Sequence, residues 1–405
     1  MLKVSLILLV LSAAAVLADF EPFLDIPFKP VRTSAERIES HGYPSESHYV
    51  ETEDGYVLNM FRIPHSPKLK NEKKERPVVF IMHGLFSCSD CFLLNGPDNA
   101  LAYNYVDAGY DVWLGNARGN LYSRKNTKMS INHPYFWRFS WHEIGHYDLP
   151  AMIDYVLATT GQEKLHYVGH SQGCTTFFVM GSTRPEYNKK IKTAHMLAPP
   201  IFMGNVTEGI ILATAPYVGS PGLGAELLQN QVFLPLNQYI QRLLDTACSN
   251  QPIMLSYCKT LALMWGGDLG NLNATLLPQV AETHPAGIST NQGIHFIQSY
   301  VSNDFRRYDW GPKNNLAFYG TEVPPSYDIT KIDANLYLYS GEADGSANVM
   351  DIARLPGLLP NMKELYTIPD PTFGHLDFIF ANSVKEIIND KVIGISKDYD
   401  AKNKF

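Results

Sequence analysis

The sequence lacks long apolar runs beyond its first residues, and it has no cluster of basic charge. The formal net charge is −7, and the one Lys-rich segment, residues 68–76, also carries Glu72 and Glu75. That segment therefore favours a solvated loop, and the balance of charge argues against nucleic acid as a partner. After residue 18, no stretch is long and uncharged enough to span a bilayer. No repeat or low-complexity segment interrupts the chain, and a hydrophobic content of 45% suffices for a sizeable core.

The one markedly apolar run lies at the N-terminus. A basic residue precedes Val4–Val16, and small residues follow where a signal peptidase cleaves. We therefore expect residues 1–18 to be a signal peptide, with the mature chain starting near Asp19; a buried N-terminal helix or a membrane anchor is the alternative. The sequons at Asn205 and Asn273 are candidate glycosylation sites. These features predict a secreted, extracellular protein, with the lysosomal lumen as the alternative.

Cysteine is scarce, and its odd count of five leaves at least one thiol unpaired in a secreted chain. Cys248 and Cys258 close a short loop, where a bridge would add about 3 kcal/mol. Cys88 and Cys91 are also close in sequence and are candidates to pair, although a two-residue spacer strains the bridge. Cys174 lies in an apolar stretch that predicts a buried thiol.

Short β-branched and aromatic runs alternate with helical patterns such as residues 149–157. This alternation predicts an α/β fold with a mostly parallel sheet covered on both faces. Residues 201–321 break the alternation and predict an inserted helical cap, or lid, domain. The core would then comprise residues 19–200 and 322–405. The expected strands lie at residues 77–82, 110–114, 165–168 and 335–339.

A nucleophile motif follows one of these strands. Residues 169–173 read Gly-His-Ser-Gln-Gly, which matches G-x-S-x-G between a strand and a buried helical stretch. The turn from strand to helix is so tight that glycines must flank the serine. A glycine-rich turn without function is the alternative, but the strand and helix context favours Ser171 as a nucleophile.

A serine hydroxyl needs a base to remove its proton and an acid to orient that base. In the α/β-hydrolase fold the chain order is Ser, Asp or Glu, then His. Asp344 and His375 follow strands in that order and are the predicted acid and base. Glu342 is the alternative acid, and Asp377 is expected to begin a helix.

The oxyanion of the reaction needs two backbone N–H donors. We expect one from Gln172, the residue after the nucleophile, and one from Leu85 in the loop after an early strand. His83 is expected to support that loop rather than to perform chemistry.

Residues 142–146 also match H-E-x-x-H, the zinc-protease motif, with His142, Glu143 and His146. That chemistry needs both histidines on one face of a continuous helix. Asp148 followed by Pro150 is typical of a helix start, which would place the histidines before the helix. A zinc protease is therefore a remote alternative, and no metal or cofactor is expected.

Longer segments of the chain resemble the acid lipase family of gastric, lysosomal and insect lipases. The resemblance extends over nearly the whole mature chain. The matching segments include Gly42–Val50, Asp107–Asn120, Tyr147–Ala151, Leu165–Gly173, Pro285–Gly287, Asp309–Gly311 and His375–Ile379.

The resemblance implies an α/β-hydrolase core, a mobile helical lid, and hydrolysis of neutral lipid esters without a cofactor. Its nucleophile, acid and base fall on Ser171, Asp344 and His375, and its oxyanion amides on Leu85 and Gln172. Its cap disulfide corresponds to Cys248 and Cys258. One departure is Asn348, where family members typically carry a second aspartate.

The cap composition agrees with a lipid substrate. Gly209–Ala225 carries no charge and is rich in large apolar residues. This run either lines an acyl site and touches a lipid–water interface, or forms the core of the cap. The sequence therefore predicts a lipase acting on triacylglycerol or sterol esters, with a catalytically inactive lipid-binding or storage protein on the same fold as the alternative.

Overall fold

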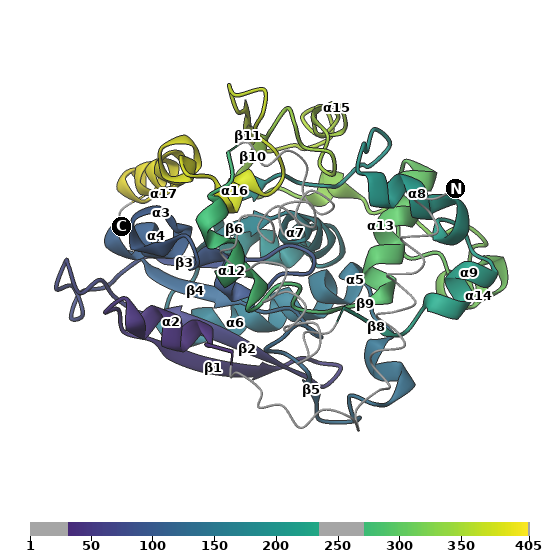
Figure 1. The fold of residues 1–405 in the computed structure, drawn as a ribbon, viewed down its shortest axis with the longest axis horizontal. Helices are drawn as coiled ribbons and strands as arrows, with labels where there is room; N and C mark the ends of the chain where they lie inside the picture. Colours follow the sequence, from purple (N-terminus) through teal and green to yellow (C-terminus); the bar gives the residue numbers. More distant parts are fainter. Residues whose placement is uncertain (1–30, 235–270, 404–405) are drawn as a thin grey trace.

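The computed structural model describes residues 31–234 and 271–403. Figure 1 shows a central sheet with helices packed around it. Early elements are α2 (Ser34–Ser40), β1 (Glu46–Glu51), β2 (Tyr56–Ile63), β3 (Val78–Met82), η1 (Ser89–Phe92), α3 (Gly96–Asn99), α4 (Leu101–Asp107), β4 (Asp111–Gly115), β5 (Lys125–Asn126), η2 (Pro134–Trp137), α5 (Trp141–Glu143), η3 (Ile144–Asp148), α6 (Leu149–Thr160), β6 (Leu165–His170), α7 (Gln172–Thr183), η4 (Pro185–Lys190) and β7 (Ile191–Leu197).

Later elements are α8 (Gly209–Val218), α9 (Leu223–Leu228), β8 (Val232–Phe233), η5 (Ala274–Leu276), α12 (Leu277–Ala281), β9 (Ile288–Ser289), α13 (Thr290–Ser302), α14 (Pro312–Tyr319), η6 (Ile329–Lys331), β10 (Leu336–Ser340), α15 (Val349–Ile352), β11 (Met362–Thr367), α16 (Asp377–Phe380), η7 (Lys385–Asn389) and α17 (Asp390–Lys402).

The large sheet confirms the expected mostly parallel architecture. Its strand order is β1-β2-β4-β3-β6-β7-β10-β11, with β5 paired to β2. The β1–β2 and β2–β4 pairs are antiparallel, and every pair from β4 to β11 is parallel. The four strands expected from the sequence correspond to β3, β4, β6 and β10.

The central strands are buried on both faces. Every residue of β3, β4 and β6 is buried, as the β-branched and aromatic content of these strands requires. Helices α4 and α17 contact β4 and β7, whereas η3, α6 and α7 pack against one another. Parallel strands place their carboxyl ends at a common edge, so the loops after β3, β6, β10 and β11 converge there.

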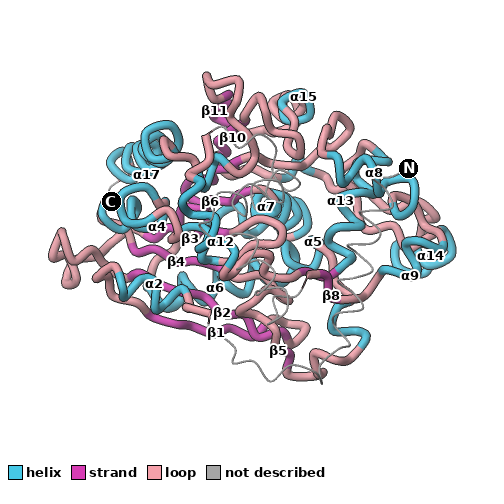
Figure 2. The backbone as a smooth tube through the Cα atoms, viewed as in Figure 1, coloured by secondary structure: helices cyan, strands magenta, loops and turns pink. Residues whose placement is uncertain are grey.

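The described part of residues 201–321 contributes no strand to the large sheet (Figure 2). It holds α8, α9, α12, α13 and α14, together with the short β8–β9 pair. Helices α8, α9, α13 and α14 gather at one end of the molecule, on the right in Figure 1, and α8 packs on α13. Cys248, Cys258 and residues 1–18 lie outside the described residues, and the domain boundaries stay a prediction.

The expected helix start at Asp148 is wrong. Helical structure begins at Trp141, where Ser140 and Glu143 form a reciprocal capping box, and it continues to Thr160. Pro150 is accommodated because η3 is a π-helical turn, in which the Leu149 N–H bonds to a carbonyl five residues back. Asp148 is buried, and its carboxylate accepts hydrogen bonds from Arg118 instead of capping a helix.

Cys88 and Cys91 do not pair, and both are buried free thiols. The Cys88 thiol donates to the Asp90 carboxylate at 3.3 Å. Cys174 is also free and buried, as expected, and its thiol contacts the carbonyl oxygens of Gly169 and Leu197. No helix in residues 31–234 or 271–403 is long and apolar enough to cross a membrane.

Candidate active site

Ser171 lies in the tight turn between β6 and α7. Its φ of 53° and ψ of −119° place a non-glycine residue in a strained region of backbone space. The Ser171 N–H donates to the Leu197 carbonyl, and the Ser171 carbonyl accepts from the Cys174 N–H at 2.8 Å. These bonds hold the strained turn and present the side chain at the carboxyl edge of the sheet.

The flanking glycines are required by close backbone contacts. A Cβ at Gly173 would lie 2.4 Å from the Met82 carbonyl oxygen, and one at Gly169 would lie 2.8 Å from the Gly173 carbonyl carbon. Both separations are shorter than carbon atoms tolerate. The G-x-S-x-G pattern is thus explained by packing of the turn against β3.

The structure brings together the three residues that sequence spacing places far apart. Ser171 Oγ lies 2.7 Å from His375 Nε2, and His375 Nδ1 lies 2.7 Å from Asp344 Oδ2. The other carboxylate oxygen of Asp344 accepts the N–H groups of Ser346 and Ala347, at 2.9 and 2.7 Å. With its carboxylate so engaged, Asp344 fixes the imidazole with Nδ1 protonated and Nε2 free to accept a proton from Ser171.

Ser171, His375 and Asp344 form a hydrogen-bonded row. Within this row, Asp344 and His375 each shift the pKa of the other toward the charged form. Burial lowers the pKa of His375, but the charge and hydrogen bond of Asp344, aided by the charge of Glu208, raise it above its ordinary value. Burial raises the pKa of Asp344, yet His375 and the two amides bring it below its ordinary value. Asp344 is therefore held as the carboxylate facing the imidazole.

The neighbours of the acid take other roles. Glu342 is exposed, and the carboxylate that faces His375 is that of Asp344, so the geometry does not favour Glu342 as the acid. Asp377 begins α16 and accepts the Gly374 N–H at 2.7 Å. Asn348 caps α15 by accepting the Met350 N–H at 2.9 Å, and its side chain makes no hydrogen bond to Ser171, Asp344 or His375.

The loop after β3 lies directly against the nucleophile. A Cβ at Gly84 would lie 3.0 Å from Ser171 Cβ. Leu85, whose amide is the predicted oxyanion donor, is the next residue in the chain. Gln172 begins α7, and its side-chain carbonyl accepts a hydrogen bond from Gln292 Nε2 at 3.0 Å. The oxyanion role of the Leu85 and Gln172 amides stays a prediction.

His83 supports this loop, in line with its expected role. Its Nδ1–H donates to the Gly84 carbonyl at 2.8 Å, and its Nε2 accepts from the Ala117 N–H and from Asn120 Nδ2. Burial lowers the pKa of His83 to about 4, so it stays neutral at physiological pH. The neutral imidazole makes hydrogen bonds through both ring nitrogens, and it thereby connects the loop after β3 to the loop after β4.

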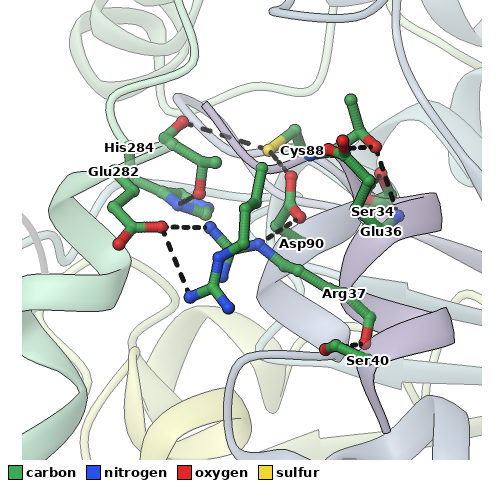
Figure 3. Close-up of polar contacts among 12 residues, drawn as sticks. Ser34, Glu36, Arg37, Ser40, Cys88, Asp90, Glu282 and His284 are labelled. Atoms are coloured by element: carbon green, nitrogen blue, oxygen red, sulfur yellow. Dashed lines mark hydrogen bonds and ion pairs between the residues drawn. The ribbon is translucent and has the colours of Figure 1, made fainter. Parts of the chain in front are cut away.

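A buried ionic cluster anchors the far end of the same loop (Figure 3). Arg37 of α2 pairs with Asp90 at 3.0 Å and with Glu282 at 2.7 Å. The loop also bonds to the segment after α12, through Ser87 Oγ with His284 Nε2 at 2.9 Å and through the Phe86 carbonyl. Two distant segments, α2 and residues 282–286, therefore fix the loop that carries Leu85.

Sequence reasoning missed two residues around His375. His170 donates from Nε2 to the His375 carbonyl at 3.0 Å. Glu208, at the start of α8, accepts a hydrogen bond from the Ser346 hydroxyl beside Asp344. The position of His170 inside the G-x-S-x-G pentapeptide was a usable signal, whereas Glu208 had none, because only the fold brings it to Ser346.

The residues of the H-E-x-x-H match are engaged elsewhere. His142 and His146 do stack on one helix face, with ring centroids 5.5 Å apart, but each Nδ1 bonds to a hydroxyl, of Tyr327 and Thr183 respectively. The Glu143 carboxylate closes the capping box with Ser140. The described residues contain no group of three or more His, Cys, Asp or Glu side chains arranged for a metal ion.

The two sequons lie in contrasting surroundings. Asn205 donates from Nδ2 to the buried Asp351 carboxylate at 2.8 Å and also donates its backbone N–H. Asn273 starts η5, and its side-chain oxygen accepts the Thr275 hydroxyl at 2.6 Å. Both asparagines are partly exposed, and their glycosylation stays a prediction.

Family comparisons agree with the fold and the site. A model described as a partial alpha/beta-hydrolase lipase region matches residues 34–96, and one described as alpha/beta hydrolase fold matches residues 77–381. The chain belongs to the α/β-hydrolase family. An epoxide hydrolase from Vigna radiata shares the fold, with a TM-score of 0.51 at 16% identity over 91% of this chain and 100% of that one.

Within this family, the similar relatives are lipases. Lipase 3 of Drosophila melanogaster is 43% identical, covering 92% of this chain and 94% of its own. Gastric triacylglycerol lipase of Homo sapiens is 39% identical over 88% and 89%, and lysosomal acid lipase/cholesteryl ester hydrolase of Macaca fascicularis is 36% identical over 90% of each. The expected resemblance to the acid lipase family is confirmed, and the enzyme class it implies is carboxylic ester hydrolase.

Proposed function

We propose that this α/β-hydrolase is a secreted serine lipase that cleaves neutral lipid esters through an acyl-enzyme on Ser171. The observation that carries the proposal is the continuous hydrogen-bonded row from Ser171 through His375 to Asp344, with both links at 2.7 Å. A hydroxyl, a neutral imidazole acceptor and a buried carboxylate in that order supply what acyl transfer needs.

In the first half-reaction, the Ser171 proton passes to His375 Nε2 as Oγ attacks the ester carbonyl carbon. The carbonyl electron pair moves onto oxygen, where the Leu85 and Gln172 N–H groups stabilise it. The tetrahedral species then collapses, the bond to the alcohol breaks, and the alcohol leaves with the proton from His375. The acyl group remains bonded to Ser171.

The second half-reaction repeats these steps with water. His375 takes a proton from the water as it attacks the acyl carbon, and a second tetrahedral species forms. This species collapses as the bond between Ser171 Oγ and the acyl carbon breaks, and the protonated imidazole returns the proton to Oγ. The fatty acid is released and the row is restored. Asp344 stays ionised throughout and stabilises the imidazolium.

The cap supports a lipid substrate. Large apolar side chains on α8 and α9 face solvent, led by Leu223 at 73% and Leu227 at 63% exposure. Such a patch costs free energy in water and favours contact with a lipid–water interface. Relatives named triacylglycerol lipase and cholesteryl ester hydrolase make triacylglycerol and sterol esters the substrates to test first.

We further propose that the protein enters the secretory pathway, with extracellular residence favoured and the lysosomal lumen as the alternative. The apolar N-terminus and two sequons support this, as do relatives whose names are gastric and lysosomal. N-terminal sequencing of the mature protein would start near Asp19 if residues 1–18 are removed.

The test is the hydrolysis of short-chain and long-chain esters by wild type, Ser171→Ala and Ser130→Ala. Ser130 is exposed and lies on the loop after β5, so it controls for the loss of a hydroxyl. We expect Ser171→Ala to lose turnover while keeping its unfolding temperature, and Ser130→Ala to match wild type. A folded Ser171→Ala with normal turnover would refute the proposed mechanism.

A further inference from the structure

Glu208 is a buried carboxylic acid beside the proposed catalytic row that the proposed mechanism does not use. It is only 8% exposed, and among the described residues no ion pair joins it to lysine or arginine. It is the residue preceding α8, yet its side chain does not cap that helix. Burying a carboxylate without a cationic partner is costly, so its environment calls for an explanation.

The side chain of Glu208 is held by the acid loop. Its Oε2 accepts the hydroxyl proton of Ser346, whose own N–H donates to Asp344 Oδ1 at 2.9 Å. Ser346 therefore touches both carboxylates, one with each of its polar hydrogens. The arrangement aligns Glu208 with the same loop that positions the proposed acid.

The backbone next to Glu208 fastens the same loop. The Thr207 N–H donates to the Gly345 carbonyl at 2.9 Å, and a Cβ at Gly345 would lie 3.1 Å from Thr207 Oγ1. The start of the cap and the acid loop are thus in close contact over residues 207–208 and 344–347. A change at Glu208 would be transmitted to Asp344 through this contact.

The cation that acts on Glu208 is His375. Burial raises the pKa of the Glu208 carboxyl above its ordinary value, and the negative charge of Asp344 adds to this, against the lowering effects of the Ser346 hydrogen bond and the His375 charge. Reciprocally, the charge of Glu208 contributes, after that of Asp344, to raising the pKa of His375. Two carboxylates therefore act on one imidazole.

The other titratable group against His375 does not interfere with this pairing. Burial lowers the pKa of His170 to about 3, so that ring is neutral over the working range. The pKa of Asp344 lies below its ordinary value, so Asp344 stays ionised. Between acidic and neutral pH, the groups at this point that change charge are His375 and Glu208.

We propose that Glu208 is a positioning residue for the ester hydrolysis proposed above: its carboxylate, held by Ser346, stabilises the protonated form of His375 and fixes the acid loop that carries Asp344. The inference rests on the proposed function, since protonated His375 forms only when Ser171 loses its proton. Glu208 itself transfers no proton and touches no reacting atom.

The test is the pH dependence of kcat/KM on a soluble short-chain p-nitrophenyl ester, for wild type, Glu208→Gln, Glu208→Asp and Ser346→Ala. Removing the Glu208 charge lowers the pKa of His375. In Glu208→Gln, the acid limb of the profile, where kcat/KM rises with pH, therefore moves to lower pH by about half a unit or more. Its plateau kcat falls roughly threefold or more because the imidazolium loses a stabilising charge. Glu208→Asp keeps the charge and restores most of the wild-type limb.

Ser346→Ala tests the same point without changing Glu208. Without the Ser346 hydroxyl, Glu208 ionises less readily in acid, so the acid limb again moves to lower pH, by less than in Glu208→Gln. Glu226→Gln, an exposed carboxylate of α9, controls for loss of one negative charge in the cap and leaves the profile unchanged.

The outcomes separate this inference from the function on which it rests. Folded variants whose acid limbs coincide with wild type overturn the role of Glu208 while leaving the lipase intact. Equal loss of kcat in Glu208→Gln and Glu208→Asp, with an unmoved limb, also overturns it, since packing alone would then explain the loss. If Glu208→Gln does not fold, the limb of Ser346→Ala decides. A wild type without Ser171-dependent hydrolysis refutes the proposed function instead.

Discussion

His375 Nδ1 lies 2.7 Å from Asp344 Oδ2, and the opposite oxygen of the same carboxylate is held by two backbone N–H groups. The two N–H groups prevent the carboxylate from rotating. Its other oxygen, Oδ2, therefore stays directed at the imidazole. The imidazole is therefore fixed in both tautomer and direction before any substrate binds. Preorganisation of this kind reduces the rearrangement needed in the transition state.

Asp344→Asn should retain the fold and lose most of its turnover. An amide at this position donates to Nδ1, so the imidazole takes the wrong tautomer and kcat falls by about 10³–10⁴-fold. The loss of charge also lowers the pKa of His375, so the acid limb of residual activity moves to lower pH. Steady-state kinetics against pH measure both effects. Glu342→Gln, which changes an exposed neighbour, should match wild type; a reversed order of the two variants would identify Glu342 as the acid.

Asn348→Asp should change activity less than about twofold, because asparagine and aspartate cap helices comparably well. The Asn348 side chain accepts the Met350 N–H and makes no hydrogen bond to Ser171, His375 or Asp344. Rates on a soluble ester, with thermal unfolding as the control for stability, measure this. A large gain of activity in Asn348→Asp would mean that the departure from the family pattern weakens the wild-type enzyme.

Gly173→Ala should destabilise the protein. The new methyl group would lie 2.4 Å from the Met82 carbonyl oxygen, which belongs to the rigid central strand β3. Overpacking of a buried site costs about 1–3 kcal/mol, and the displaced turn also carries Ser171. Denaturant unfolding should therefore give a lower midpoint, with activity reduced as well. Gly394→Ala, where a Cβ meets nothing within 4 Å on helix α17, is the matched control.

Leu223→Glu combined with Leu227→Glu should impair the hydrolysis of emulsified long-chain triacylglycerol. Burying a leucine is favourable by about 1.5–3 kcal/mol, so charges at both positions predict a loss of about tenfold or more at the interface. The rate on a soluble short-chain ester should stay near wild type. Leu69→Glu, an exposed leucine on the loop between β2 and β3, controls for added charge. Equal losses on both substrates would mean that the substitutions disturb the folded enzyme as a whole rather than its contact with the lipid–water interface.

Much of the fold follows from local patterns in the sequence. Residues 78–82 are buried on both faces, so their continuous apolar content marks a central parallel strand. The motif around Ser171 is equally local, because its glycines are demanded by contacts within the turn and with the neighbouring strand. His375 and Asp344 could be predicted because chain order and strand ends restrict the choice.

Other features depend on contacts between distant segments and leave no local trace. The helix through His142 and Pro150 is continuous because a π-turn absorbs the proline, and Asp148 is drawn away from capping by buried Arg118. Glu208 and Ser346 are 138 positions apart, and only the docking of the cap on the acid loop joins them. Cys88 remains a free thiol because the loop directs its side chain to the Asp90 carboxylate, which accepts its hydrogen bond.

The most direct test of the central claim is intact-mass analysis of the protein after treatment with a fluorophosphonate, with peptide mapping of the adduct. The reagent phosphonylates a serine hydroxyl only where a base removes its proton and donors stabilise the developing oxyanion. We predict a single adduct on Ser171, formed in step with the loss of ester hydrolysis and absent from Ser171→Ala. Folded protein that forms no adduct at acidic or neutral pH, or that is labelled at another serine while hydrolysis is lost, would contradict the account.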